Sequence, residues 1–141
     1  MIQILQTPNK GKGIFTMKNI TKDEIVLIIT GKLVKDVYDE DQSVGERWLG
    51  VGNQEWIDVD ENNPMYYMNH SCDPNTKIDG MKVIALRDIL DGEELTFDYA
   101  LTEQDPYWQM KCNCGSSNCR GIIKGETTFV EIHNDTLVSV P

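Results

Sequence analysis

The chain has 141 residues, of which 23 are acidic and 13 are basic, so its formal net charge is -10. This length matches one domain with a real hydrophobic core. The acidic balance argues against direct nucleic acid binding and favours a basic peptide or a cationic small molecule as the partner, unless the charge serves only solubility.

The sequence contains neither an apolar run of roughly 18 residues nor a signal peptide. We therefore expect no membrane association and an intracellular location, cytoplasmic, or nuclear if the host is eukaryotic. The four cysteines would then be metal ligands or free thiols rather than disulfides.

Short strands with frequent turns between them dominate the first half of the chain. Residues 35–47 hold five acidic side chains without apolar periodicity, which predicts a solvated loop. The continuous apolar run Ile25–Ile29 predicts a buried strand, and Leu33 and Val34 begin its expected partner. The other predicted strands are Ile2–Leu5, Gly13–Met17, Trp48–Val51 and Trp56–Val59.

The second half continues this mainly β pattern. Met81–Leu86 predicts a buried strand, and in Gly92–Tyr99 the side chains of Leu95 and Phe97 should face one side while Thr96 and Asp98 face the other. A C-terminal hairpin is predicted from Thr127–His133 and Thr136–Val140, turning at Asn134 and Asp135. The fold class is therefore mainly β.

Residues 66–75 concentrate polar side chains in one short stretch, with Asn69, His70, Ser71, Cys72, Asp73 and Asn75. Residues 73–75 alone have the composition of an ordinary turn. The preceding Tyr66, Tyr67 and Met68 are large enough to draw the segment into a core, where its polar groups must be hydrogen-bonded. Such a buried polar run is typical of a functional site.

Three cysteines occur close together near the C-terminus, with the spacing C-x-C-x4-C at Cys112, Cys114 and Cys119. A closed structural zinc site needs four ligands, and Cys72 is the only cysteine left to complete it. The cysteines therefore predict structural zinc, the alternative being a reduced cluster without metal.

The segments Asn69–Asn75 and Gly92–Tyr99 resemble the two signature motifs of the SET domain protein-lysine methyltransferases, and Gly11–Phe15 resembles the opening Gly-x-Gly of that family. The late cysteines resemble its post-SET module. This resemblance covers roughly residues 9–121 and implies several small sheets with a pseudoknot between the Asn69 and Gly92 segments. It divides the chain into a catalytic domain (1–106), a post-SET zinc module (107–121) and a C-terminal extension (122–141), with no pre-SET module.

The resemblance implies transfer of methyl groups from S-adenosylmethionine to a lysine of a basic protein or peptide, with a histone tail as one candidate. It makes Tyr99 the catalytic residue and places Phe97 and Tyr67 in the substrate channel. A phenylalanine at position 97 leaves space for di- or trimethylation. The implied cofactor residues are Lys12, Gly13, Ile14, Phe15, Asn69 and His70. Trp108 and Tyr107, just before the cysteine cluster, are candidates for stacking on adenine or for closing the channel, the alternative being packing within a lid.

Two positions depart from the family pattern. Ile29 stands where many members have a channel tyrosine, and Tyr66 replaces the arginine that often opens the Asn-His-Ser-Cys motif. Two other functions remain open from the sequence. One is an inactive SET-like module that binds basic peptides, and the other is a zinc-dependent interaction module.

Overall fold

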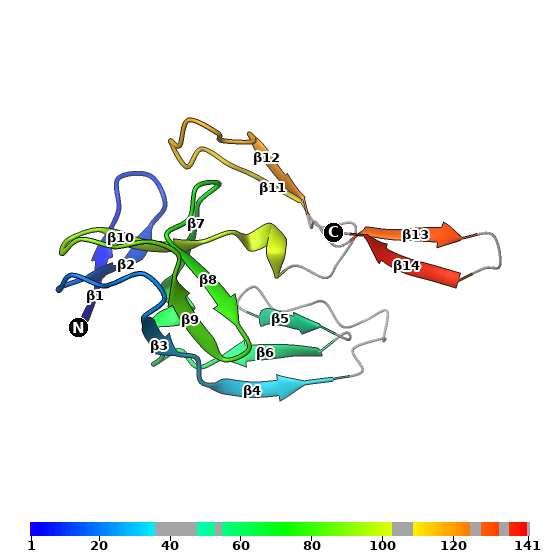
Figure 1. The fold of residues 1–141 in the computed structure, drawn as a ribbon, viewed down its shortest axis with the longest axis horizontal. Coiled ribbons are helices and arrows are strands. Elements are labelled where there is room, and N and C mark those ends of the chain that lie inside the picture. Colours follow the sequence, from blue (N-terminus) through cyan, green and yellow to red (C-terminus); the bar gives the residue numbers. More distant parts are fainter. Residues whose placement is uncertain (36–47, 53–54, 103–108, 125–127, 133–135, 141) are drawn as a thin grey trace.

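The computed structural model describes residues 1–35, 48–52, 55–102, 109–124, 128–132 and 136–140. These residues form several small β-sheets linked by loops and by two short 3-10 helices (Figure 1). The prediction of a mainly β fold is therefore confirmed. Within the described ranges, no helix has the length and hydropathy needed to cross a bilayer. Most of the predicted acidic loop, residues 36–47, lies outside the described residues.

One sheet brings the N-terminal strands together with the two segments that contain the signature motifs. Its strand order is β1-β2-β10-β7. Strand β10 pairs antiparallel with β2 and parallel with β7, where Thr96 lies opposite Asn69 and Phe97 opposite His70. The segments expected to form the pseudoknot therefore lie side by side. The strand bounds are β1 (Ile2–Gln6), β2 (Lys12–Thr16), β7 (Asn69–His70) and β10 (Glu94–Phe97).

A second sheet has the order β3-β9-β8, with bounds β3 (Ile25–Ile28), β8 (Thr76–Asp79) and β9 (Lys82–Ala85). The prediction that the Ile25–Ile29 strand is buried is wrong for most of its length, because Ile25 is 48% exposed and Ile28 is 53% exposed. Val26 and Leu27 are partly buried and pack against the core, and Ile29, after the strand, is a member of it. Strand β8 was not predicted, although the Asp-Gly pair at 79–80 is a hairpin signal and Gly80 has a positive φ of 60°.

The third sheet, β4-β6-β5, corrects a predicted pairing. Strand β4 (Gly31–Val34) pairs with β6 (Glu55–Val59) instead of β3, and β6 also pairs with β5 (Trp48–Gly52). The chain leaves one sheet at Ile29, whose N–H donates to Met81, and enters the next at Thr30, whose carbonyl accepts from Asp60. A Cβ at Gly31 would lie 2.4 Å from the Asp58 carbonyl oxygen, so this close approach of two strands requires glycine.

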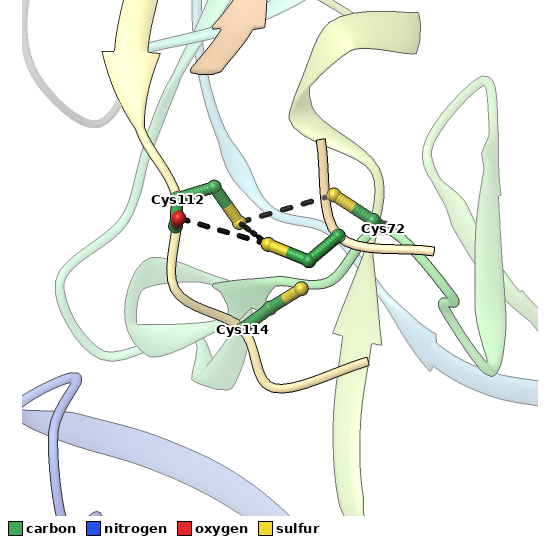
Figure 2. Close-up of side chains that lie close together, drawn as sticks. Cys72, Cys112 and Cys114 are labelled. Carbon is green, nitrogen blue, oxygen red and sulfur yellow. Dashed lines mark hydrogen bonds between the residues drawn. The ribbon is translucent and has the colours of Figure 1, made fainter. Parts of the chain in front are cut away.

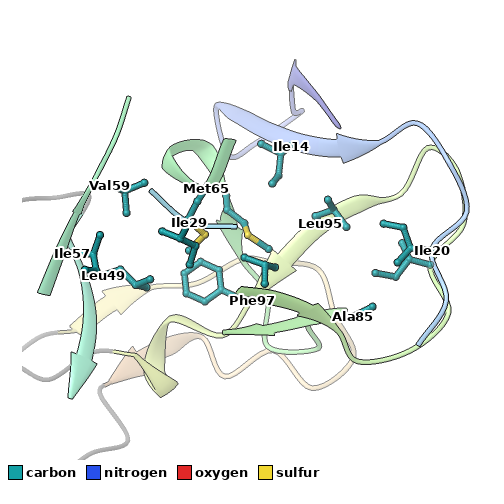
Figure 3. Packing of buried hydrophobic residues seen from close by; sticks show 13 residues of the cluster. Ile14, Ile20, Ile29, Leu49, Ile57, Val59, Met65, Ala85, Leu95 and Phe97 are labelled. Carbon is teal, nitrogen blue, oxygen red and sulfur yellow. The ribbon is translucent and has the colours of Figure 1, made fainter. Parts of the chain in front are cut away.

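The hydrophobic core lies where these three sheets meet (Figure 3). Ile14 of β2, Leu95 of β10 and Val83 of β9 are fully buried in it. Thr96, which the predicted alternation places on the side of β10 opposite to Leu95 and Phe97, is buried as well as they are. Both faces of β10 are therefore covered, and β2 and β7 pair with its two edges.

The polar stretch around His70 is buried for the most part, with Asn69 half-buried and Asp73 exposed. Asn75 inserts its amide beside β10, donating to the Glu94 carbonyl at 2.8 Å and accepting from the Thr96 N–H at 2.9 Å. Asn63 caps the 3-10 helix η1 (Pro64–Tyr67) and also donates to the Ile28 carbonyl. These side chains fix the motif segment against two sheets.

Two hairpins follow strand β10 and the short 3-10 helix η2 (Tyr99–Leu101). Strands β11 (Gln109–Lys111) and β12 (Ile122–Lys124) pair antiparallel around three of the cysteines, and we call residues 109–124 the cysteine module. Strands β13 (Thr128–Ile132) and β14 (Thr136–Val140) form the predicted C-terminal hairpin, whose turn lies outside the described residues.

Candidate functional site

All four cysteines converge on one point (Figure 2). Cys72 comes from the loop after β7, and the other three come from the connection between β11 and β12. Their sulfur atoms all lie within 4.8 Å of one another. The Cys112 sulfur is 3.8 Å from that of Cys72 and 3.7 Å from that of Cys119.

This arrangement fits a structural zinc ion. A tetrahedral site with Zn–S bonds of about 2.3 Å places neighbouring sulfurs about 3.8 Å apart. Four thiolates also form the donor set that zinc prefers in closed structural sites. The four cysteines predicted as ligands are therefore brought together with suitable spacing and chemistry.

The thiols of the cluster differ in their tendency to ionise. Burial raises the pKa of Cys112 to about 12. Burial acts in the same direction on Cys114, but hydrogen bonds, chiefly from the Ser116 hydroxyl at 2.9 Å, outweigh it and lower the pKa to about 5. A bound zinc ion would hold all four as thiolates. Gly115 allows the sharp turn between them through a φ of 81°.

His70 joins the cysteine cluster to Tyr99. Its Nδ1 accepts a hydrogen bond from the Tyr99 N–H at 3.1 Å, and its Nε2 lies 3.3 Å from the Cys72 sulfur. Because Nδ1 is an acceptor, the neutral ring carries its proton on Nε2 and donates it to Cys72. Burial lowers the pKa of His70 to about 4, although the nearby Asp98 carboxylate acts in the opposite direction. The imidazole is therefore neutral at physiological pH.

The Tyr99 side chain lies over the start of the motif segment. Its hydroxyl donates to the Met68 carbonyl at 2.7 Å. Its ring contacts Phe97, with centroids 4.8 Å apart, and His70, with centroids 5.3 Å apart. Tyr99, Phe97 and the Asn69 segment are thus held at one place, as the resemblance implied.

A second group of contacts surrounds the Asn69 side chain and joins it to β2 and β10. The Asn69 amide nitrogen donates to the Lys12 carbonyl and to the Glu94 carboxylate, both at 2.9 Å. Gly13 lies against these groups, because a Cβ there would be 2.5 Å from the Glu94 carboxylate and 2.9 Å from the Asn69 amide nitrogen. Lys12 places its ammonium 5.5 Å from the ring centroid of Tyr67.

The remaining predicted site residues are placed less uniformly. Ile14 is fully buried in the core, so only its backbone is available to a ligand. Phe15, the next residue of β2, lies opposite Glu94 of β10. Ile29, at the position of the family's channel tyrosine, is 2% exposed and belongs to the core. Trp108 lies outside the described residues.

Two charged residues of this site were not singled out from the sequence. Arg120 pairs with Asp98 at 2.7 Å and donates to the Cys72 sulfur through Nε at 3.3 Å. These hydrogen bonds raise the pKa of Arg120 further above its usual value. The sequence offered one signal for both residues, which is their position. Asp98 directly precedes the predicted catalytic Tyr99, and Arg120 directly follows the predicted zinc ligand Cys119.

Comparison with known proteins places this geometry among related chains. The family model described as "SET domain" matches residues 11–100. Histone-lysine N-methyltransferase 2B of Homo sapiens is 32% identical over 126 residues, which cover 78% of this chain and 5% of that protein. Histone-lysine N-methyltransferase ASHR3 of Arabidopsis thaliana is 27% identical over 139 residues, covering 86% of this chain and 28% of that protein.

Solved structures share the same fold. A crystal structure of KRYPTONITE in complex with mCHG DNA and SAH superimposes with a TM-score of 0.69 at 22% identity, covering 86% of this chain and 28% of that one. Another, in complex with mCHH DNA, H3(1-15) peptide and SAH, also gives a TM-score of 0.69, at 21% identity, with coverage of 86% and 29%. The chain thus spans less than a third of the length of each of these relatives and crystallised chains.

Proposed function

The chain belongs to the SET domain family, and we propose that it transfers methyl groups from S-adenosylmethionine to a lysine side chain of a basic protein substrate. The observation that carries this proposal is the convergence of Asn69 and Tyr99, which the parallel pairing of β7 with β10 produces. The Tyr99 hydroxyl is fixed on the carbonyl of Met68, the residue directly before Asn69. Cofactor-binding and methyl-transfer roles therefore meet in one short segment.

We assign cofactor binding to Lys12, Gly13, Ile14, Phe15, Asn69 and His70, with Trp108 as an additional adenine contact. S-adenosylmethionine would supply an electrophilic methyl group and a cationic amine. Both donated hydrogen bonds of the Asn69 amide are directed at Lys12 and Glu94, so the group it offers to a ligand is its carbonyl oxygen. The absence of a side chain at Gly13 keeps the adjacent backbone close to these groups.

We assign the catalytic role to Tyr99 and the walls of the lysine channel to Phe97 and Tyr67. Methyl transfer by in-line displacement depends on alignment of the reacting atoms and on exclusion of water. The Tyr99 ring is held between Phe97 and His70, which fixes its orientation. Tyr99 therefore orients the reacting groups and does not attack. Because Phe97 has no hydroxyl, we propose di- or trimethyllysine as the product.

The four cysteines Cys72, Cys112, Cys114 and Cys119 would hold a structural zinc ion as in a post-SET module. We propose a catalytic domain of residues 1–106, a zinc module of residues 107–121 and a C-terminal extension of residues 122–141. The pairing of β12 with β11 attaches the start of that extension to the module. Cys72 attaches the module to the motif segment.

We propose a basic, lysine-containing segment as the substrate, with a histone tail as the first candidate. The net charge of -10 favours a cationic partner, and the related chains include proteins named as histone-lysine N-methyltransferases. The same charge argues against direct nucleic acid binding. Four free cysteines suit a reducing compartment, either the cytoplasm or, in a eukaryotic host, the nucleus.

The test is methylation of histones and of a host lysate, followed by mass spectrometry, with wild-type protein and two variants. Tyr99→Phe should lower turnover about 100-fold or more while S-adenosylhomocysteine affinity stays unchanged, because the hydroxyl acts in alignment. Asn69→Ala should instead weaken that affinity, measured by calorimetry. A Tyr99→Phe variant as active as wild type would contradict the catalytic assignment.

The same experiment separates the proposal from two other functions. An inactive SET-like module would bind a basic peptide without producing methyllysine. A zinc-dependent interaction module would have no affinity for S-adenosylhomocysteine. The ordered contacts of Tyr99 and Asn69 favour the methyltransferase, because neither alternative requires them.

A further inference from the structure

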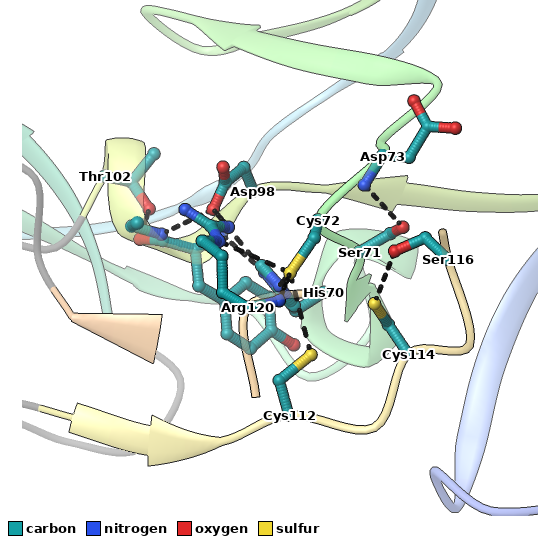
Figure 4. A network of polar contacts seen from close by, with 12 residues as sticks. His70, Ser71, Cys72, Asp73, Asp98, Thr102, Cys112, Cys114, Ser116 and Arg120 are labelled. Atoms are coloured by element: carbon teal, nitrogen blue, oxygen red, sulfur yellow. Dashed lines mark hydrogen bonds and ion pairs between the residues drawn. The ribbon is translucent and has the colours of Figure 1, made fainter. Parts of the chain in front are cut away.

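Arg120 spans the distance between the cysteine cluster and the turn that contains Tyr99 (Figure 4). Its backbone N–H and its Nε donate to the Cys72 sulfur at 3.4 Å and 3.3 Å. Its Nη2 donates to the Asp98 carboxylate at 2.7 Å. One guanidinium therefore contacts a cysteine of the cluster and the residue directly before Tyr99.

Asp98 has a defined structural task in that turn. The same carboxylate oxygen that binds Arg120 accepts a hydrogen bond from the Ala100 N–H at 3.0 Å and caps η2. It also lies 3.6 Å from Nδ1 of His70, the atom that accepts the Tyr99 N–H. The position of the Asp98 side chain and the orientation of the Tyr99 backbone are therefore linked.

We propose that Arg120 is a positioning residue that couples the metal site to Tyr99. Its donors stabilise the charge on the Cys72 sulfur and hold the Asp98 cap of the Tyr99 turn in place. The coupling to activity rests on the proposed function, and the coupling to the metal site does not. Hydrogen bonds to metal ligands of this kind orient the ligands and tune metal affinity.

The geometry requires the arginine fork as well as its charge. Nε points to sulfur while Nη2 points to a carboxylate, and a planar guanidinium can satisfy both in fixed directions. A lysine ammonium carries all its N–H donors on one nitrogen and cannot reproduce the two separate, fixed donor directions of the guanidinium. An ordinary surface ion pair contributes little and would tolerate lysine. The exchange of arginine for lysine therefore distinguishes the two roles.

We expect substitutions of Arg120 to leave the fold intact. The Arg120 side chain is 32% exposed and forms part of the wall of an open depression of about 600 Å³ beside the module. A shorter side chain would leave space for water rather than a dry cavity. Arg87 offers a matched control, because it pairs with Glu93 at 3.3 Å in the loop between β9 and β10 and is also partly exposed.

The experiment compares zinc-loaded wild type, Arg120→Lys, Arg120→Ala and Arg87→Lys. Zinc release to a chromogenic chelator and amide hydrogen exchange of residues 98–102 are measured in the absence of substrate. We expect both Arg120 variants to release zinc about 10–100-fold faster and to exchange faster at residues 98–102, whereas Arg87→Lys matches wild type. With substrate, kcat should fall in the Arg120 variants while the affinity for S-adenosylhomocysteine is retained.

Wild-type zinc release or wild-type exchange in Arg120→Lys would overturn the proposal. A kcat that stays at the wild-type value would also overturn it. If the wild-type protein transfers no methyl groups to any substrate, the proposed function fails separately. Zinc release and hydrogen exchange then still decide whether Arg120 couples the two regions.

Discussion

The sheets of residues 1–102 and the cysteine module of residues 109–124 are stabilised in different ways. Every member of the main hydrophobic cluster comes from the first region, where Ile14, Val83 and Leu95 are fully buried. In the module, Ile123 is the fully buried side chain among those described. Sulfur atoms and polar contacts hold the rest. The difference indicates that apolar burial stabilises the first region, whereas the second depends on its metal ligands.

The two regions meet at Cys72, which belongs to the motif segment by sequence and to the cysteine cluster by position. The Asn118 amide donates to its carbonyl at 3.0 Å, and His70 and Arg120 contact its sulfur. A change in the module therefore reaches the motif segment through Cys72 and its hydrogen bonds, and it reaches the Tyr99 turn through the Arg120–Asp98 pair. This arrangement explains how a module outside the main core can still affect the site.

Metal removal should have the largest effect on this contrast. Structural zinc contributes about 10–16 kcal/mol of apparent binding free energy in small domains, far more than the module's few apolar contacts. We expect about one zinc per chain, and chelation should raise hydrogen exchange throughout residues 109–124 while the strands β2, β9 and β10 stay protected. Methyl transfer should be lost with the metal.

The control for metal removal is reconstitution. Adding zinc back should restore both protection and activity, because the core provides an intact attachment point at Cys72. Equal loss of protection in the module and in β10 would contradict the division into two separately stabilised regions. Activity that persists without metal would contradict the coupling between them.

A core substitution should have the opposite pattern and a smaller magnitude. Leu95→Ala removes a fully buried side chain from β10 and should lower the free energy of unfolding by about 2–5 kcal/mol, measured by denaturant titration. Its zinc content should remain that of wild type, because Leu95 belongs to the main hydrophobic cluster, which contains none of the four cysteines. Leu90→Ala is the matched control, since Leu90 is 64% exposed and should change stability little. Loss of zinc in Leu95→Ala would show that the module depends on the core more than we infer.

The sequence predicted the local features well because each had a local signal. Apolar runs marked most strands, and the unused Cys72 completed the set of four cysteines that the structure brings together. The pairing of β4 was not predictable in the same way, because a two-residue connection after β3 suits a hairpin. The actual partner, β6, lies more than 20 residues later in the chain. The local trace of this pairing in the sequence is Gly31, where the close approach of the two strands requires a glycine.

Burial and side-chain bridges were also beyond the sequence. The apolar run at Ile25 indicated a strand correctly but could not show that Ile25 and Ile28 would remain exposed. No sequence pattern links Asp98 with Arg120, because their pairing depends on how the module folds back on Cys72. Tertiary contacts of this kind have no periodic signal.

The smallest expected effect concerns the product and tests the boundary between core and site at Phe97. This side chain is 5% exposed, packs in the main cluster and also contacts the Tyr99 ring. A hydroxyl added by Phe97→Tyr would occupy volume beside Tyr99 and hold a water that a methylated amine must displace. We expect the wild type to form di- or trimethyllysine and Phe97→Tyr to accumulate monomethyllysine at a similar first-step rate. Intact-mass spectra of a single-lysine peptide after long incubation measure this.

Phe97→Leu serves as the matched control for that prediction, because it removes the ring without adding a hydroxyl. It should lower stability, as a core substitution does, and should still form the higher methylation states. If Phe97 is only a core residue, both variants would lose stability and neither would change the product distribution. Ile29 stands at the position of the family's channel tyrosine and is buried in the same cluster as Phe97. A wild-type product that stops at one methyl group would refute the assignment of Phe97 as the residue that sets the methylation state.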